Sequence, residues 1–312
     1  MTLALLFSPQ GAQRVGMGRQ LAELSPAARR TFEVADRALG WAVSDLCWDG
    51  PVERLDDTRQ TQPCLVATSL AALAALRERL EPRPEFVAGH SVGEYAALVA
   101  AGVVGLEDGL RLAGRRAALM ADQDAPGGMA AVLGLDRDAV ASVVAALSDD
   151  VVVANDNAPG QVVISGTAEA LARAADALRA AGARRVMPLT VSGPFHSPFM
   201  DPVAEQLARA FDEVEWHDAS PPLVSNVTAE PLTDAREIRA SLAEQVRSPV
   251  EWVRSVRRIA DAGVDTFVEC GPAGVLSGMV RRIVPGARTL TVEDVASLDA
   301  TVEALATVGA PA

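Results

Sequence analysis

The order of predicted elements between residues 128 and 190 is the feature that most narrows the fold. Short runs rich in Val, Ile, Met and Ala are interspersed with two Ala-rich segments of helical periodicity. The strands are predicted at 129–133, 151–154, 161–165 and 185–189, and the helices at 136–147 and 168–181. A β-α-β-β-α-β order is that of a ferredoxin-like, or split βαβ, unit. We therefore expect a compact ferredoxin-like small subdomain over residues 128–195.

Strand-like and helix-like segments also alternate on both sides of that unit. The strands are predicted at 3–7, 85–89, 222–227 and 265–269, and the helices at 64–80, 94–101, 107–120, 197–211, 248–262 and 275–283. Such alternation predicts a mostly parallel sheet covered by helices. The predicted fold class is therefore α/β, with a large subdomain made from residues 1–127 and 196–312 and interrupted by the small one.

The charge balance excludes some classes of function. Acidic residues outnumber basic ones by 41 to 28, which gives a net charge of −13. A general nucleic-acid binder needs cations to neutralise phosphates, so this class is disfavoured. All 28 basic residues are arginine. The absence of lysine removes Schiff-base and lysine-nucleophile chemistry.

Cysteine usage and apolar patterning indicate a cytoplasmic protein. Cys47, Cys64 and Cys270 show no CxxC spacing and lie in apolar or helical contexts, so we expect buried free thiols and no metal site. The apolar run at 3–7 lacks the basic flank and the length of a signal peptide. The longest apolar stretches, such as 95–104, are too short and too interrupted by glycine to span a bilayer.

One motif carries a candidate nucleophile. Gly89-His-Ser-Val-Gly93 is a G-x-S-x-G sequence between a predicted strand and a predicted helix, with Glu94 in the first helical turn. This is the context of the nucleophile elbow of α/β-hydrolases, in which a sharp turn exposes the serine hydroxyl. The alternative is an ordinary glycine-rich turn. The setting favours Ser91 as a nucleophile and an α/β-hydrolase-like large subdomain.

A serine nucleophile needs a base, and the chain has three histidines. His90 adjoins Ser91 on a sharp turn, where neighbouring side chains diverge, so a packing or pocket-lining role is expected for it. His217 lies in an acidic polar stretch typical of an exposed loop. His196 begins a helix where the chain re-enters the large subdomain. By elimination His196 is the better candidate, against the alternative of a structural histidine at a helix start.

Several further segments resemble one family, the malonyl-coenzyme A:acyl carrier protein transacylases, together with the related acyltransferases of polyketide synthases. They occur in family order and span nearly the whole chain. The segments are Phe7-Ser-Pro-Gln-Gly-Ala-Gln13, Thr61-Gln-Pro63, Gly89-His-Ser-Val-Gly-Glu94, Arg116-Ala-Ala-Leu-Met120, Asn155-Asp-Asn-Ala-Pro-Gly-Gln161, Val191-Ser-Gly-Pro-Phe-His-Ser197, Gln245-Val-Arg-Ser-Pro-Val-Glu-Trp252 and Glu269-Cys-Gly-Pro272.

The resemblance implies a Ser–His dyad in place of a triad. A backbone carbonyl, at Gln245, would orient the histidine, while the Gln245 side chain could be exposed on its helix. The backbone amides of Val92 and Gln10 would form the oxyanion hole, which is usually the largest catalytic contribution. This chain departs from the family just before Gln10. It has Ser8-Pro9 where the family usually has Pro-Gly, and the proline fixes φ and removes a donor beside a catalytic amide.

The resemblance also implies the substrate-binding residues. Arg116 matches the arginine that binds the free carboxylate of malonate, which a planar guanidinium can grip with two hydrogen bonds. Its ordinary interpretation would be a surface charge, as for Arg115. Phe195 matches a position that favours malonyl over methylmalonyl, although a core-filling phenylalanine remains an alternative. The positions Gln62, Met120 and Asn157 match the family near the pocket.

The nucleophile motif and the resemblance together imply an acyltransferase that moves a malonyl-type group from coenzyme A to a carrier protein through an ester on Ser91. The expected partners are malonyl-coenzyme A and an acyl carrier protein, with no cofactor, no metal, no nucleic acid and no membrane. An acyl hydrolase on the same scaffold is the nearest alternative. A catalytically idle docking module and a lipase-type hydrolase are further ones, and the lipase would need an acidic triad member.

Overall fold

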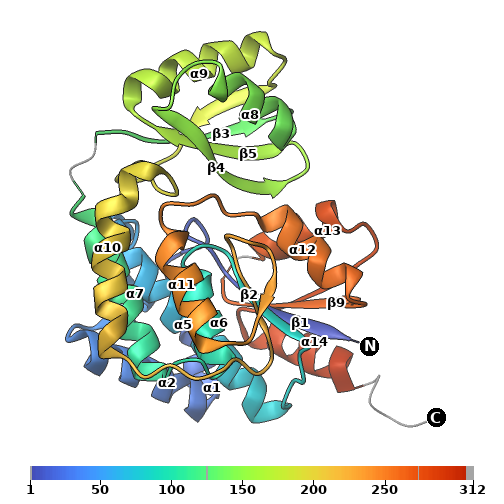
Figure 1. The fold of residues 1–312 in the computed structure, drawn as a ribbon. Helices are drawn as coiled ribbons and strands as arrows, with labels where there is room; N and C mark the ends of the chain where they lie inside the picture. Colours follow the sequence, from blue (N-terminus) through green and yellow to red (C-terminus); the bar gives the residue numbers. More distant parts are fainter. Residues whose placement is uncertain (1, 124–125, 273, 307–312) are drawn as a thin grey trace.

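The computed structural model describes residues 2–123, 126–272 and 274–306, which form two α/β units of unequal size (Figure 1). The larger unit contains a six-stranded sheet in the order β10-β9-β1-β2-β7-β8, and the smaller one a four-stranded sheet in the order β4-β5-β3-β6. Both sheets and their helices agree with the predicted fold class. The division of the chain after residues 127 and 195 stays a prediction.

The six-stranded sheet is parallel except at one edge. Its strands are β1 (Leu3–Phe7), β2 (Phe86–Gly89), β7 (Leu223–Val224), β8 (Pro231–Leu232), β9 (Thr266–Cys270) and β10 (Arg288–Val292). Strand β1 lies in the middle and pairs in parallel with β2 and β9, whereas β8 runs antiparallel to β7. All five residues of β1 are apolar and buried, as expected for a strand covered on both faces.

Helices cover both faces of this sheet (Figure 1). The helices of the larger unit are α1 (Arg19–Leu24), α2 (Pro26–Leu39), α3 (Val43–Asp49), α4 (Val52–Leu55), α5 (Thr58–Arg79), α6 (Gly93–Ala100), α7 (Leu106–Ala121), α10 (Asp201–Ala210), α11 (Ala235–Gln245), α12 (Trp252–Asp261), α13 (Val275–Ile283) and α14 (Val295–Ala306). No helix in the described part of the chain is long and apolar enough to cross a membrane.

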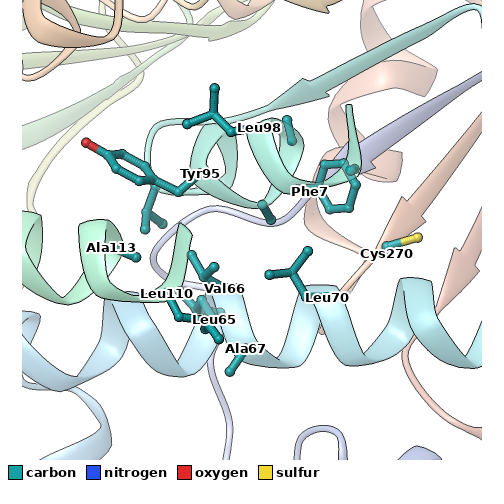
Figure 2. Packing of buried hydrophobic residues seen from close by; sticks show 14 of the residues in the cluster. Phe7, Leu65, Val66, Ala67, Leu70, Tyr95, Leu98, Leu110, Ala113 and Cys270 are labelled. Atoms are coloured by element: carbon teal, nitrogen blue, oxygen red, sulfur yellow. The ribbon is translucent and has the colours of Figure 1, made fainter. Parts of the chain in front are cut away.

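Helix α5 is the centre of the main core. Its apolar residues are spread around the whole circumference, as in a helix surrounded by protein. Figure 2 shows Leu65, Val66 and Leu70 of this helix near Tyr95 of α6 and Phe7 of β1. Because α6 follows the nucleophile motif directly, this core fixes the position of that motif.

The smaller unit has the ferredoxin-like topology that the sequence predicts. Strands β3 (Gly128–Leu133), β4 (Val151–Ala158), β5 (Gln161–Gly166) and β6 (Arg185–Pro188) pair antiparallel, with helices α8 (Arg137–Ala145) and α9 (Ala168–Ala180) packed on one face. The side chains of a strand alternate between its two faces. Val132 and Ile164 therefore face these helices, whereas Met129 and Val163 line a cavity on the other side.

Several predicted elements have different bounds in the structure. The strand expected at 222–227 is only two residues long, because Ser225 Oγ accepts the backbone N–H groups of Val227 and Thr228 and turns the chain. The helix expected from 248 begins at Trp252, because Val250 first pairs with β4 through backbone hydrogen bonds. Strand β4 runs to Ala158 rather than 154, with two register shifts.

Candidate active site

Ser91 lies on a sharp turn between the end of β2 and the start of α6. Its φ of 52° is rare for a residue with a side chain and marks local backbone strain. The flanking glycines are required by space: a methyl group on Gly89 would lie 2.0 Å from the Gly93 carbonyl, and one on Gly93 would lie 2.2 Å from Phe7 O. The predicted nucleophile elbow is therefore present.

Asn226 braces this turn from the loop after β7. Its Oδ1 accepts the Ser91 backbone N–H at 2.6 Å, and its Nδ2 donates to Gly89 O at 2.6 Å. The side chain is fully buried. Sequence reasoning missed Asn226, because it lies 135 residues from Ser91 in a stretch with no pattern of its own.

His196 lies against the Ser91 hydroxyl. Its Nε2 is 2.7 Å from Ser91 Oγ, and its Nδ1 lies 2.9 Å from Gln245 O and 3.2 Å from Ser248 O. Since carbonyls accept only, the proton is assigned to Nδ1, which leaves Nε2 to accept the serine proton. No carboxylate faces Nδ1 among the described residues, so the acidic partner of a lipase-type triad is missing there.

The imidazole of His196 is held in its neutral form. Its pKa is lowered to about 3, mainly by burial and then by the positive charge of Arg116, against the hydrogen bonds to the two carbonyls. A neutral imidazole beside a serine hydroxyl can accept its proton. The backbone strain seen at Ser91 recurs here, since His196 also has a positive φ of 55°.

Two backbone amides near Ser91 are available to bind a substrate oxygen. Within the described ranges, the N–H groups of Gln10 and Val92 donate to no other protein group. The loop that carries Gln10 is anchored by Ser8, whose Oγ donates to the buried carboxylate of Glu269 at 3.3 Å. This contact gives the Ser8-Pro9 sequence an anchor of its own beside the candidate oxyanion hole.

Arg116 is buried in the same cavity, with 1% of its surface exposed. It donates to Gln62 Oε1 at 2.6 Å, to Ser91 Oγ at 3.0 Å and to Gln245 Oε1 at 3.1 Å. Its guanidinium also lies over the ring of Tyr95, 5.7 Å from the centroid. Burial lowers the pKa of Arg116, while Tyr95 and Glu94 oppose that shift.

No carboxylate forms an ion pair with Arg116 in the part of the chain that the structure describes. A buried cation held only by neutral acceptors is costly. It therefore offers a strong site for an anionic group of a ligand. This placement excludes the surface-charge interpretation, which does hold for the exposed Arg115.

The cavity in front of Ser91 has a volume of about 510 Å³. Met120 of α7, Met129 of β3 and Phe195 contribute to its wall. His90 and Asn157 close one side, with His90 Nε2 2.7 Å from Asn157 Oδ1. Burial lowers the pKa of His90 to about 4, so it is neutral and its role is in packing and lining, as predicted.

The structure thus brings together all the predicted site residues. The one correction concerns the Gln245 side chain, which could have been exposed but is 99% buried and contacts Arg116, Ser91 and Glu94. It is buried because α11 ends against the turn that carries Ser91. His217 is exposed, as expected of a loop residue.

Comparisons with known proteins define the class. The family model described as "Acyl transferase domain" matches residues 4–300. The fold and the site are therefore those of the acyl transferase class.

The more similar relatives share one description. The malonyl CoA-acyl carrier protein transacylase of Bacillus subtilis is 41% identical over 97% of this chain and 97% of its own. That of Salmonella typhimurium is 40% identical over 95% and 97%. The chain belongs to the malonyl CoA-acyl carrier protein transacylase family.

Solved structures agree. An acyl carrier protein S-malonyltransferase from Vibrio cholerae has a TM-score of 0.93 at 39% identity, covering 96% of this chain and 100% of that one. A malonyl-transacylase in complex with a type II PKS acyl-carrier protein has a TM-score of 0.94 at 39% identity, covering 97% and 100%.

Proposed function

We propose that this protein transfers a malonyl group from coenzyme A to the phosphopantetheine thiol of an acyl carrier protein through an ester on Ser91. The observation that carries the proposal is the placement of the unpaired cation of Arg116 3.0 Å from the Ser91 hydroxyl, which is 2.7 Å from His196 Nε2. A nucleophile, a base and an anion site within one cavity fit an acyl group with a free carboxylate. The names of the relatives support the same donor and acceptor.

In the first half-reaction, Ser91 Oγ attacks the thioester carbonyl while His196 Nε2 takes its proton. The amides of Gln10 and Val92 bind the developing oxyanion. When the carbon–sulfur bond breaks, the proton passes from His196 to the coenzyme A thiolate, and malonyl remains as an ester on Ser91. The carbonyl of Gln245 keeps the imidazole oriented throughout.

In the second half-reaction, the carrier thiol gives its proton to His196 Nε2 and attacks the ester. The carbon–oxygen bond breaks, and the proton returns to Ser91 Oγ. The chain supplies the nucleophile, the base and the oxyanion donors, so the proposed cycle uses the coenzyme A thioester as a substrate and requires no cofactor or metal.

The substrate also adjusts the base. The positive charge of Arg116 lowers the pKa of His196. A malonyl carboxylate bound to Arg116 offsets that charge and makes His196 more basic. An acetyl group leaves Arg116 unpaired and His196 weakly basic. Selection for a dicarboxylic acyl group thus acts on both binding and the proton transfer.

Phe195 sets a second level of selectivity. Its buried ring lies in the cavity wall next to His196. An α-methyl group on the substrate would crowd this ring, and one methylene-sized difference typically changes binding by about 1–3 kcal/mol. We therefore expect malonyl to be preferred over methylmalonyl by a modest factor.

An acyl hydrolase on the same scaffold is the alternative left open by the sequence. Clearing simple acyl groups does not call for a buried guanidinium at the nucleophile, and the relatives are described as transacylases.

The three cysteines are buried free thiols, which fits a reducing compartment such as the cytoplasm.

The test is a competition among malonyl-, methylmalonyl- and acetyl-coenzyme A, read by intact-protein mass spectrometry. We expect a persistent malonyl adduct on Ser91, a weaker methylmalonyl adduct and a barely detectable acetyl adduct. The Ser91→Ala variant is the control and should carry none. Rapid release of free malonate without a carrier protein would favour the hydrolase, and an adduct on another residue would overturn the proposal.

A further inference from the structure

The Gln245 side chain joins three parts of the site through one amide. Its Oε1 accepts from Arg116 at 3.1 Å, and its Nε2 donates to Ser91 O at 3.0 Å and to a carboxylate oxygen of Glu94. Its backbone carbonyl accepts from His196. The orientation of this amide therefore affects both the Arg116 guanidinium and the backbone of Ser91.

An amide can face either way unless its neighbours decide. Glu94 and the Ser91 carbonyl are acceptors, so the Gln245 NH₂ must face them, and its oxygen must then face Arg116. In the reversed orientation, the NH₂ would face the guanidinium and the oxygen would face two acceptors. The side chains of Glu94, Arg116 and Gln245 are buried, where unmatched polar contacts are costly.

Glu94 also lies next to Asn226, the other residue that holds the nucleophile turn in place. Against the larger effect of burial, which raises the pKa of Glu94, the backbone N–H of Asn226 faces the carboxylate and lowers that pKa. The Asn226 side chain in turn holds the Ser91 N–H and the Gly89 carbonyl. Both residues that hold the strained Ser91 backbone therefore face one carboxylate, which is only 2% exposed and accepts a hydrogen bond from Gln245.

The mechanism makes no use of Glu94, because its contacts are to Gln245 and Asn226 and not to the reacting atoms. We propose that Glu94 is a positioning residue: it fixes the Gln245 amide so that an acceptor faces Arg116, and thereby aligns the guanidinium for the substrate carboxylate. This inference rests on the proposed function, in which Arg116 binds the malonyl carboxylate.

The experiment compares Glu94→Leu with Glu94→Gln in steady-state transfer to a carrier protein. Leucine removes the acceptor, so the KM for malonyl-coenzyme A should rise about tenfold, and the preference for malonyl over acetyl should fall by a similar factor. The effect on KM should be the larger one, because Arg116 already binds the carboxylate in the ground state. The kcat should fall by a smaller factor, because weaker pairing with Arg116 leaves His196 less basic. Glutamine keeps an oxygen for Gln245 and should restore both values to within about twofold.

Glu107→Leu is the matched control. Glu107 is a partly exposed glutamate in the first turn of α7, and it pairs with Arg111, whereas the Gln245 amide donates to Glu94. It should leave KM and selectivity unchanged. A double-mutant cycle with Gln245→Met gives the second measurement, because residues that act through one another are not additive. Glu94→Leu should add little in the Gln245→Met background.

The outcomes separate this inference from the proposed function. A folded Glu94→Leu protein with unchanged KM and selectivity, or full additivity with Gln245→Met, would overturn the role of Glu94. If Glu94→Leu does not fold, Gln245→Met alone must raise KM and lower the malonyl preference, and its failure to do so has the same meaning. A protein without substitutions that forms no malonyl ester on Ser91 would instead overturn the proposed function.

Discussion

At the residue scale, two of the three histidines are buried next to polar partners and stay neutral. His90 contacts Asn157, and its ring packs edge-on against Trp252 at a centroid distance of 5.3 Å. Its pKa falls from 6.5 to about 4 because burial disfavours the imidazolium. Between these values the unfolded chain binds a proton that the folded protein does not.

His90 should therefore make folding sensitive to acid. Its contribution to the free energy of unfolding is present above about pH 6.5 and is lost as the pH falls towards 4. The full loss is about 3 kcal/mol, because each tenfold change in proton affinity corresponds to about 1.36 kcal/mol. Chemical denaturation of the protein and of His90→Gln at several pH values checks this. The difference between the two should grow with pH from 4 to 6.5, and a constant difference would contradict the assignment.

The sequence predicted the residues of the site better than their contacts. Ser91, His196 and Arg116 were found because local motifs carry them. The same motifs could not reveal that Asn226 and the Gln245 side chain clasp the Ser91 backbone, because these residues are 135 and 154 positions away. Such contacts depend on which loop ends packing places beside the turn, and no short-range pattern records that.

At the scale of elements, the predictions succeed where an apolar run is bounded by strong breakers. The strand at Leu3–Phe7 and the helix at Val275–Ile283 have the predicted bounds. They fail where a tertiary contact overrides a local preference, as at Val250, which pairs with β4 instead of starting a helix. Helix α5 begins earlier than predicted, at Thr58, because Asp57 caps it ahead of Pro63.

The nucleophile turn packs directly on the end of β1, so a larger residue in this turn should destabilise the protein. In Gly93→Ala the new methyl group would meet the backbone of Phe7 and Ser8, which cannot yield without moving the loop that carries Gln10. We expect a loss of at least about 3 kcal/mol of stability. Thermal and chemical unfolding would measure it.

Gly278→Ala provides the matched control. Gly278 lies within α13, and a methyl group there has no neighbour within 4 Å. This substitution should stabilise the protein by about 0.5–1 kcal/mol, because alanine favours helix more than glycine does. Equal effects of the two substitutions would show that close packing at the turn is not the cause.

At the scale of the whole molecule, the cavity exists only while the two sheets keep their relative positions. Met129 and Asn157 line it from one unit, and Ser91 from the other. Backbone pairing of β4 with Val250 joins the units, and so does the ion pair from Arg137 to the buried Glu251 at 2.7 Å.

Removing both partners of this pair should cost less than the sum of the two single losses. Arg137→Met leaves the buried carboxylate of Glu251 without its closest cation, and we expect a loss of about 2 kcal/mol, because Arg137 itself is partly exposed. The double variant Arg137→Met/Glu251→Met should lose less than the sum of the single variants. Urea unfolding of the four proteins measures the coupling, and strictly additive losses would mean that the pair does not join the units.

The neutral acceptors around Arg116 limit how readily this enzyme could be engineered to accept other acyl groups. Gln62 and Gln245 each aim a side-chain oxygen at the guanidinium. Replacing Arg116 with an apolar residue to admit uncharged acyl chains would leave both oxygens buried without their hydrogen-bond donor. To accept a different acyl group, the enzyme would therefore need Arg116, Gln62 and Gln245 to be replaced together. Any replacement of Gln245 must also keep its backbone carbonyl oriented towards His196.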